Sequence, residues 1–218
     1  MRLLDELRAE HELIDRTLGA LRTYVARRVA GSSDAGDAAA FLRFFRDWAG
    51  HWHHAREEEV LFAALVAQVS LPADRGPIAA LGADHRRLAT LLDEMAPLLE
   101  GPLGEASERA RLEDLAVSYS RALWLHIDAE SSVLFPESEQ RLTRAGIHEL
   151  DDRRPSPDDL AARDGVSSLV ERYPATRDPH VVRGEGCAVC PSFGSPCEGI
   201  EREWWSDAEW DELADHVG

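Results

Sequence analysis

The chain has few cysteines, and they lie close together. All three fall between residues 187 and 197 of the 218 residues, so no disulfide framework links the rest of the chain. This arrangement is typical of a reducing compartment. The amino terminus, Met1-Arg-Leu-Leu-Asp-Glu, also lacks the apolar core of a signal peptide. We therefore expect a cytoplasmic protein.

Positive charge and long apolar runs are also scarce. Lysine and arginine number 24 against 41 aspartate and glutamate residues, which gives a net charge of −17. A field of this sign repels the phosphates of nucleic acids and the headgroups of anionic lipids. No uncharged apolar run is long enough to span a bilayer. We expect neither nucleic acid nor a membrane as a partner, and the sequence leaves the oligomeric state open.

Four long segments carry apolar residues at alternating steps of three and four, the pattern of amphipathic helices. They cover residues 2 to about 30, a stretch from about 37 to the turn at Leu71-Pro72, residues 78–99 and about 107–144. Short connections rich in glycine and proline are typical of an antiparallel up-down-up-down four-helix bundle. Pro136 removes a backbone donor, so we expect a kink or a loosened turn there. We predict an all-α fold, with the bundle in residues 1–148 and a small irregular or helical C-terminal extension in 149–218.

Each predicted helix has a histidine at a position where the spacing of its apolar residues predicts another apolar residue. In two of the helices a glutamate follows four residues later, one turn away on the same face. The same number of residues separates His53 from His126 and Glu57 from Glu130, so the two halves of the bundle repeat each other. Six ionisable residues therefore face the predicted core: His11, His53, Glu57, His85, His126 and Glu130.

These six residues point to a metal site. Ionisable groups in a core are costly unless they are paired, hydrogen-bonded or bound to a metal. A single inward histidine is more often a hydrogen-bonded core residue, but the repeat favours metal binding. Nitrogen and oxygen ligands suit iron, manganese or zinc. Two metals bridged by Glu57 and Glu130 would keep open positions for dioxygen, water, peroxide or nitric oxide.

Three further residues are candidates for supporting roles beside these ligands. Glu58 lies about 100° around the helix from Glu57, which favours a solvated charge over a supporting carboxylate. His54 maps onto an isoleucine in the second half and is expected to flank the ligands. Tyr119 shares a face with His126 and is either a donor to a bound oxygen species or an ordinary core tyrosine.

The combination of motifs resembles a known family. Each His-x-x-x-Glu is followed, after two residues, by Val-Leu-Phe, and the histidine of the third helix stands in Asp84-His85. Together with His11, these motifs are similar to the hemerythrin-like, or HHE cation-binding, domain over about residues 1–145. The resemblance implies a four-helix bundle with a non-haem di-iron centre, in which the two glutamates bridge the irons and the four histidines are terminal ligands.

Two departures from the dioxygen carriers of this family bear on function. The carriers have a further histidine one turn before the position of His85, where this chain has Leu81. Their second carboxylate also follows its histidine by five residues, whereas Glu130 follows by four. We predict a di-iron protein that binds dioxygen, peroxide or nitric oxide for sensing, storage or detoxification. The alternatives are a di-iron oxidase or peroxidase and a structural metal-binding bundle.

The extension carries its own candidate site. Two short helices are expected, from Ser156-Pro157 to about Arg163 and from about Val166 to Arg172, and a third is expected from Ser206. Three thiols and one imidazole form a candidate zinc site: Cys187, Cys190, Cys197 and either His180 or His216. A redox couple of the first two cysteines, unmetallated thiols and a docked aromatic tail are the alternatives.

Overall fold

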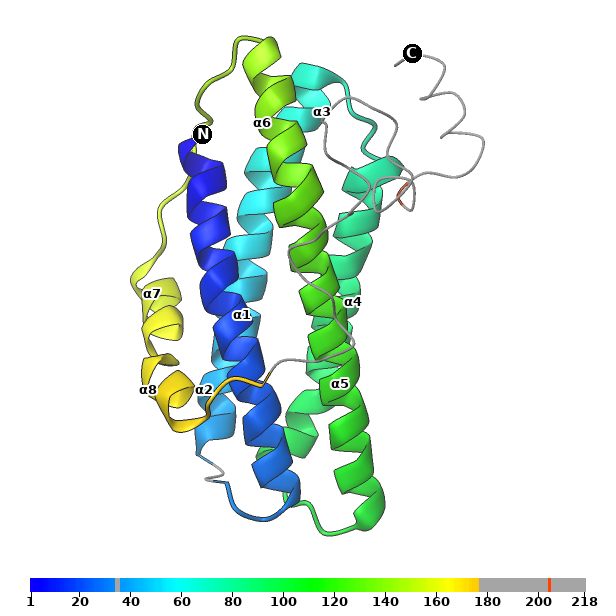
Figure 1. Cartoon of the computed structure of the whole chain (residues 1–218), viewed down its shortest axis with the longest axis vertical. Helices are drawn as coiled ribbons and strands as arrows, with labels where there is room; N and C mark the ends of the chain where they lie inside the picture. Colours follow the sequence, from blue (N-terminus) through cyan, green and yellow to red (C-terminus); the bar gives the residue numbers. More distant parts are fainter. Residues whose placement is uncertain (34–35, 177–203, 205–218) are drawn as a thin grey trace.

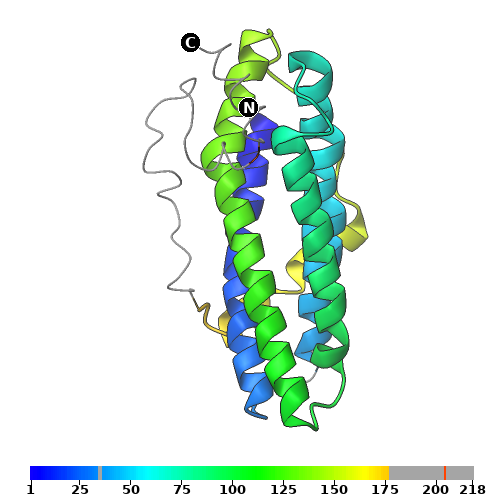
Figure 2. The ribbon, with the colours of Figure 1, turned by 90° about the vertical axis from the view of Figure 1, so that its right-hand side faces the viewer.

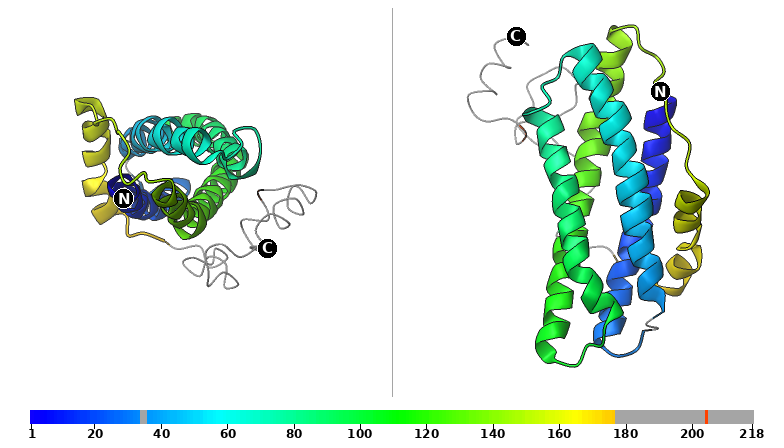
Figure 3. Two further views of the ribbon diagram at one scale, coloured as in Figure 1. Left: turned by 90° about the horizontal axis from the view of Figure 1, so that it is seen from above. Right: turned by 180° about the vertical axis from the view of Figure 1, so that it is seen from behind.

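The computed structural model describes residues 1–33, 36–176 and 204, and its helices form four long rods (Figure 1). The first rod is α1 (Arg2–Val29) and the third is α4 (Gly76–Glu100). The second consists of α2 (Asp37–Arg43), η1 (Phe44–His54), η2 (Glu57–Phe62) and α3 (Ala63–Val69). The fourth consists of α5 (Ala106–Ala129), η3 (Glu130–Leu134) and α6 (Phe135–Arg144). Successive rods run in opposite directions around a common core, so the predicted all-α four-helix bundle is confirmed (Figures 2 and 3).

Local sequence sets where the third and fourth rods begin. Gly76 adopts a positive φ of 63°, which glycine tolerates at little cost. Pro77 follows in the first turn of α4, where the missing N–H needs no helical partner. At the start of α5 the backbone N–H of Glu105 donates to the Glu108 carboxylate over 3.0 Å. These local features end the connections and start the next helices, and the connections are short enough that neighbouring rods run antiparallel.

The segments η1, η2 and η3 are π-helical, with a wider turn than an α-helix. Apolar periodicity predicted regular helix here, apart from a disturbance at Pro136. That proline is the second residue of α6, which begins directly after η3, and its missing N–H loosens the preceding turn. Each π-helical segment begins or ends at a predicted ligand or its neighbour: His54, Glu57 or Glu130. Such segments often mark functional sites in helical proteins.

The apolar core is divided into two clusters of buried side chains. One contains Ile14, Leu88 and Leu123 and continues toward the α1–α2 turn. The other contains Leu7, Leu81 and Leu134 and lies toward the opposite end of the bundle. Along each rod the predicted ligands stand between residues of the two clusters. The site is therefore a polar layer with apolar packing above and below it.

The first part of the extension packs against the outside of the bundle (Figure 3). It forms α7 (Pro157–Asp164) and α8 (Ser167–Arg172), which confirms the two short helices predicted there. Ala162 and Leu169 join the larger apolar cluster. The carboxylate of Asp37, at the start of α2, accepts hydrogen bonds from Arg172 and Tyr173 over 2.6–2.7 Å. The helix expected from Ser206 lies outside the described residues.

Over the residues described above, no helix is both long enough and apolar enough to cross a membrane.

Candidate metal centre

All six predicted ligands meet in the polar layer, and a seventh residue joins them. Their ligand atoms form two groups, within each of which all atoms lie within 4.8 Å of one another. The members are His54, Glu57, His85 and His126 in the first group and His11, His53, Glu57 and Glu130 in the second. Glu57 belongs to both groups, so one carboxylate connects two potential metal positions.

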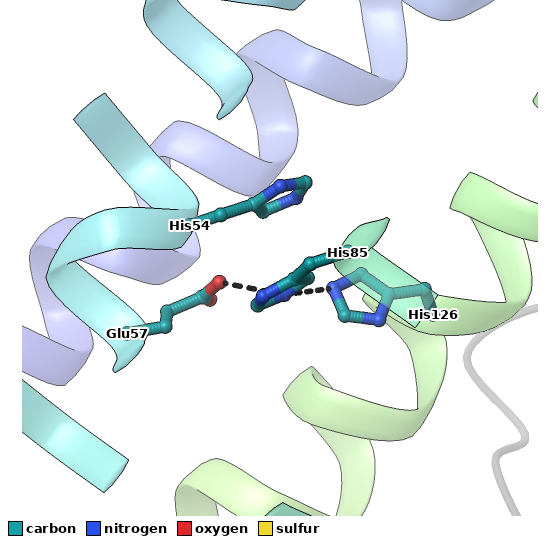
Figure 4. A group of neighbouring side chains, drawn as sticks. All are labelled: His54, Glu57, His85 and His126. Carbon is teal, nitrogen blue, oxygen red and sulfur yellow. Dashed lines mark hydrogen bonds and ion pairs between the residues drawn. The ribbon is translucent and has the colours of Figure 1, made fainter. Parts of the chain in front are cut away.

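The first group collects side chains from three rods (Figure 4). His85 of α4 places its Nε2 atom 3.1 Å from Nε2 of His126 and 3.5 Å from Oε2 of Glu57. The ring of His54 stacks on that of His85, with centroids 3.9 Å apart and an angle of 9° between the planes. Three imidazoles and one carboxylate therefore surround a common point.

The second group adds α1 to the site. His11 Nε2 lies 3.6 Å from Oε1 of Glu57 and 3.3 Å from Oε2 of Glu130. His53 Nε2 lies 3.3 Å from Oε1 of Glu57. Oε2 of Glu130 also lies 3.1 Å from Nε2 of His126, which belongs to the first group. Both carboxylates thus reach histidines of both groups, as bridging ligands must.

The ligand atoms themselves show that the site suits a cation. Glu57 and Glu130 are fully buried. Within the described residues, both oxygens of each carboxylate and Nε2 of three histidines, His11, His53 and His54, are buried without a hydrogen-bond partner. Buried polar atoms are normally satisfied, and one left unsatisfied costs about 1–3 kcal/mol. A metal ion bound by these nitrogen and oxygen atoms removes that cost.

Hydrogen bonds on the far side of the rings orient three of the histidines. Nδ1 of His85 lies 2.7 Å from the Glu58 carboxylate, and Nδ1 of His11 lies 2.8 Å from the Ser131 hydroxyl. Contacts of this kind leave Nε2 free for the metal. Nδ1 of His53 has such a partner in Glu10, 2.8 Å away.

Two of these supporting residues are related by the internal repeat. Glu58 and Ser131 each follow directly after a bridging glutamate, and each supports a histidine of another rod. Helix geometry favoured a solvated Glu58, whereas the structure places its carboxylate in contact with the candidate ligand His85.

The structure also brings His54 into the first group, where the sequence analysis expected a flanking residue. That expectation came from the internal repeat, in which His54 maps onto an isoleucine, Ile127. His54 is the last residue of the π-helical η1, whose wider turn brings the neighbours His53 and His54 closer together around the helix axis than an α-helix does. The first group therefore gains a histidine although Leu81 supplies none.

Charges around the ligands set their protonation in the absence of metal. Burial disfavours the charged imidazoles, but carboxylates outweigh it and raise the pKa of His53 and of His126 to about 10. Burial, reinforced by His85, holds the pKa of His54 well below its usual value. Burial opposes ionisation of Glu57, but His53 and the other histidines hold the pKa of this carboxyl well below 4.5. His54 is therefore ready to bind a cation at neutral pH, whereas His53 and His126 must first lose a proton.

We predict that metal binding strengthens as the pH rises from about 6.5 to about 10, because protons compete for His53 and His126. Each displaced proton contributes up to about tenfold in apparent affinity per pH unit. Titration calorimetry in buffers of different ionisation enthalpy measures the released protons. An affinity independent of pH over this range would contradict the assignment.

The stability of the metal-free protein should change in the opposite direction. The folded pKa of each histidine lies above its unfolded value of about 6.5. The protonated forms of these two histidines therefore stabilise the folded chain. This contribution to the free energy of unfolding is fully present below pH 6.5 and is lost as the pH rises through about 10. Denaturant unfolding of chelated protein at several pH values measures this loss.

A pocket of about 600 Å³ leads from solvent to the first group. Its wall includes two of the three histidines of this group, His54 and His85, together with the supporting Glu58 and apolar side chains such as Phe45 and Leu88. Tyr119 also lines it, with a side chain that is almost fully buried. Burial raises the pKa of this phenol, which stays a neutral donor. His11 and Glu130 of the second group do not line this pocket.

The candidate zinc site of the extension falls outside the described residues. This applies to all of its proposed ligands: Cys187, Cys190, Cys197, His180 and His216. The zinc site stays a prediction from the sequence.

Comparison with known proteins gave one match. The model of a family described as the hemerythrin HHE cation binding domain matches residues 2–138, well over half of the chain. All seven residues of the two groups fall within this range. Searches of curated proteins and of solved structures found no match.

Proposed function

This chain belongs to the hemerythrin HHE cation binding domain family, and from this premise we propose that it is a non-haem di-iron protein. Two irons would occupy the two groups, with manganese and zinc as the other metals that such ligands suit. The proposed ligand is dioxygen or a related small molecule, peroxide or nitric oxide. The proposed role is sensing, storage or detoxification of that ligand in the cytoplasm.

The observation that carries this proposal is the sharing of Glu57 and Glu130 between two sets of histidines. The ligand atoms fall into two groups, each within 4.8 Å, so each group suits one ion. Two ions bridged by carboxylates also explain why four buried carboxylate oxygens lack hydrogen bonds within the described residues. Iron supplies redox chemistry with dioxygen-derived ligands, and the protein holds it in a layer closed above and below by apolar side chains.

The pocket gives the proposed ligand a route to one of the two positions. It reaches His54 and His85 of the first group, so an exogenous molecule would arrive on that side. Glu58 stands in the wall with a half-exposed side chain and contacts His85. The structure thus supports an asymmetric centre, in which the ligand arrives at His54 and His85 of the first group.

Azide tests the proposed route, because it binds open positions of ferric iron with a visible absorption change. We predict that Ala89→Trp, at an exposed position in the pocket wall, slows azide binding by on the order of tenfold or more without changing iron content. Ala110→Trp, at an exposed position of α5 outside this pocket, is the matched control. Equal azide rates in the two variants would contradict entry through this pocket.

A di-iron oxidase or peroxidase is the second candidate, and the size of the pocket favours it. About 600 Å³ falls in the range of about 300–1,000 Å³ that holds small organic ligands. Dioxygen alone needs far less space. Turnover of hydrogen peroxide that is lost in Glu57→Gln would favour the enzyme, whereas a reversible oxygen-dependent spectrum without turnover would favour the binding protein.

A further inference from the structure

Arg56 is a buried cation that directly precedes the bridging Glu57. Its side chain is 1% exposed and contacts three carboxylates. The Glu6 and Glu10 carboxylates each accept a hydrogen bond over 2.7 Å, and Asp152 accepts two, over 2.5 and 3.2 Å. A guanidinium this deeply buried requires such partners, and the two-bond pairing with Asp152 is the most directional of them.

Glu10 connects this cation to a metal ligand. One oxygen of Glu10 accepts hydrogen bonds from Arg56 and, over 3.1 Å, from the Trp52 indole. The other oxygen lies 2.8 Å from Nδ1 of His53. A proton held on Nδ1 by a carboxylate keeps Nε2 as the metal-binding nitrogen and fixes the plane of the ring.

Asp152 comes from outside the region that the family model matches. It lies in the connector between α6 and α7, which runs beside the amino-terminal end of α1 (Figure 1). Its side chain is 4% exposed. The next residue, Arg153, donates to the His51 carbonyl over 2.7 Å and to the Glu59 carboxylate over 2.9 Å. The connector is thus fastened to the rod that carries His53, His54 and Glu57.

We propose that Asp152 is a positioning residue of the metal centre, acting through Arg56 and Glu10 on His53. The segment after the four-helix bundle is then part of the metal site. This inference rests on the proposed metal-binding function and extends the site to a residue that touches no ligand.

The expected consequence of losing the Asp152 charge follows from the contacts of Arg56. Without its two-bond partner the guanidinium turns toward the remaining carboxylates, Glu6 and Glu10. Glu10 then pairs more closely with Arg56 and holds His53 less well. Residues that orient a metal-bound histidine typically contribute 10- to 100-fold in metal affinity, and Asp152→Asn should weaken binding by about tenfold.

The test uses the full chain, freed of metal and titrated with Co²⁺, whose visible absorption reports the geometry of its ligands. We expect Asp152→Asn to bind Co²⁺ more weakly, with an altered spectrum, whereas Asp152→Glu should restore part of the affinity. The altered spectrum separates a positioning role from a general loss of stability.

Asp37→Asn is the matched control. Asp37 also binds the C-terminal extension, but it lies at the start of α2, 16 positions before His53 on the same rod. The substitution removes the negative charge and one of the two acceptor oxygens that Arg172 and Tyr173 contact. We expect a lower thermal midpoint with unchanged Co²⁺ affinity and spectrum.

Three outcomes would count against the inference or its premise. Wild-type affinity and spectrum in Asp152→Asn would overturn the positioning role alone. Equal weakening in Asp37→Asn would reduce the effect to fold stability and would also overturn it. A wild-type chain that binds no metal would overturn the proposed function itself.

Discussion

Replacing Glu57 with glutamine is expected to remove both metals from the chain. Glu57 is the one residue that belongs to both groups, and its two oxygens face histidines of each. Glutamine keeps the shape of the side chain but removes its negative charge and one acceptor oxygen. The loss of affinity should exceed about 100-fold, the upper end of what residues that only orient ligands contribute.

His11→Ala is the comparison that makes this prediction specific. His11 belongs to the second group only, so its loss should leave the first group with all of its ligands. Metal analysis of the purified variants should show almost no metal in Glu57→Gln and about half of the wild-type content in His11→Ala. A full complement in Glu57→Gln would show that this carboxylate does not bridge two metals.

Removal of the metal is expected to lower the thermal midpoint by about 15 to 30 °C. A ligand at a thousandfold excess over its Kd stabilises the folded chain by about 4 kcal/mol per site, and each kcal/mol shifts the midpoint of a chain of this size by about 2–4 °C. The physical cause is that the metals supply partners for the oxygens of Glu57 and Glu130, which are buried without hydrogen bonds within the described residues.

Calorimetry of metal-loaded and chelated protein at one pH measures this shift. Glu57→Gln serves as the control, because a variant that holds no metal should have the same midpoint with and without chelator. Equal midpoints for loaded and chelated wild-type protein would contradict a shared metal site in the core.

Helical periodicity was sufficient to predict the bundle and six members of the site. Inward histidines stand out against an apolar stripe, and the internal repeat assigns each a counterpart. The bounds of the short helices α7 and α8 also followed from local signals, Ser156-Pro157 among them. The helices, their inward faces and their bounds depend on residues that are near one another in the sequence, so a sequence pattern can predict them.

The positions of His54, Asp152 and the pocket could not be predicted from apolar periodicity, because they depend on local helix geometry and on packing between distant segments. His54 lies at the end of the π-helical η1, whereas the apolar periodicity of this segment predicts an ordinary α-helix. Asp152 meets Arg56 across 96 positions of the chain, and only the packing of the connector brings them together. The pocket likewise arises between the second and third rods and has no local signal.

The most direct test of the central claim is the metal content of the full chain after expression with ample iron, measured by mass spectrometry. The two groups of ligands that share Glu57 predict about two irons per chain. One metal per chain would contradict the bridged pair. Zinc alone, or no metal, would contradict the proposed chemistry with dioxygen, peroxide or nitric oxide and would leave a structural role for the bundle.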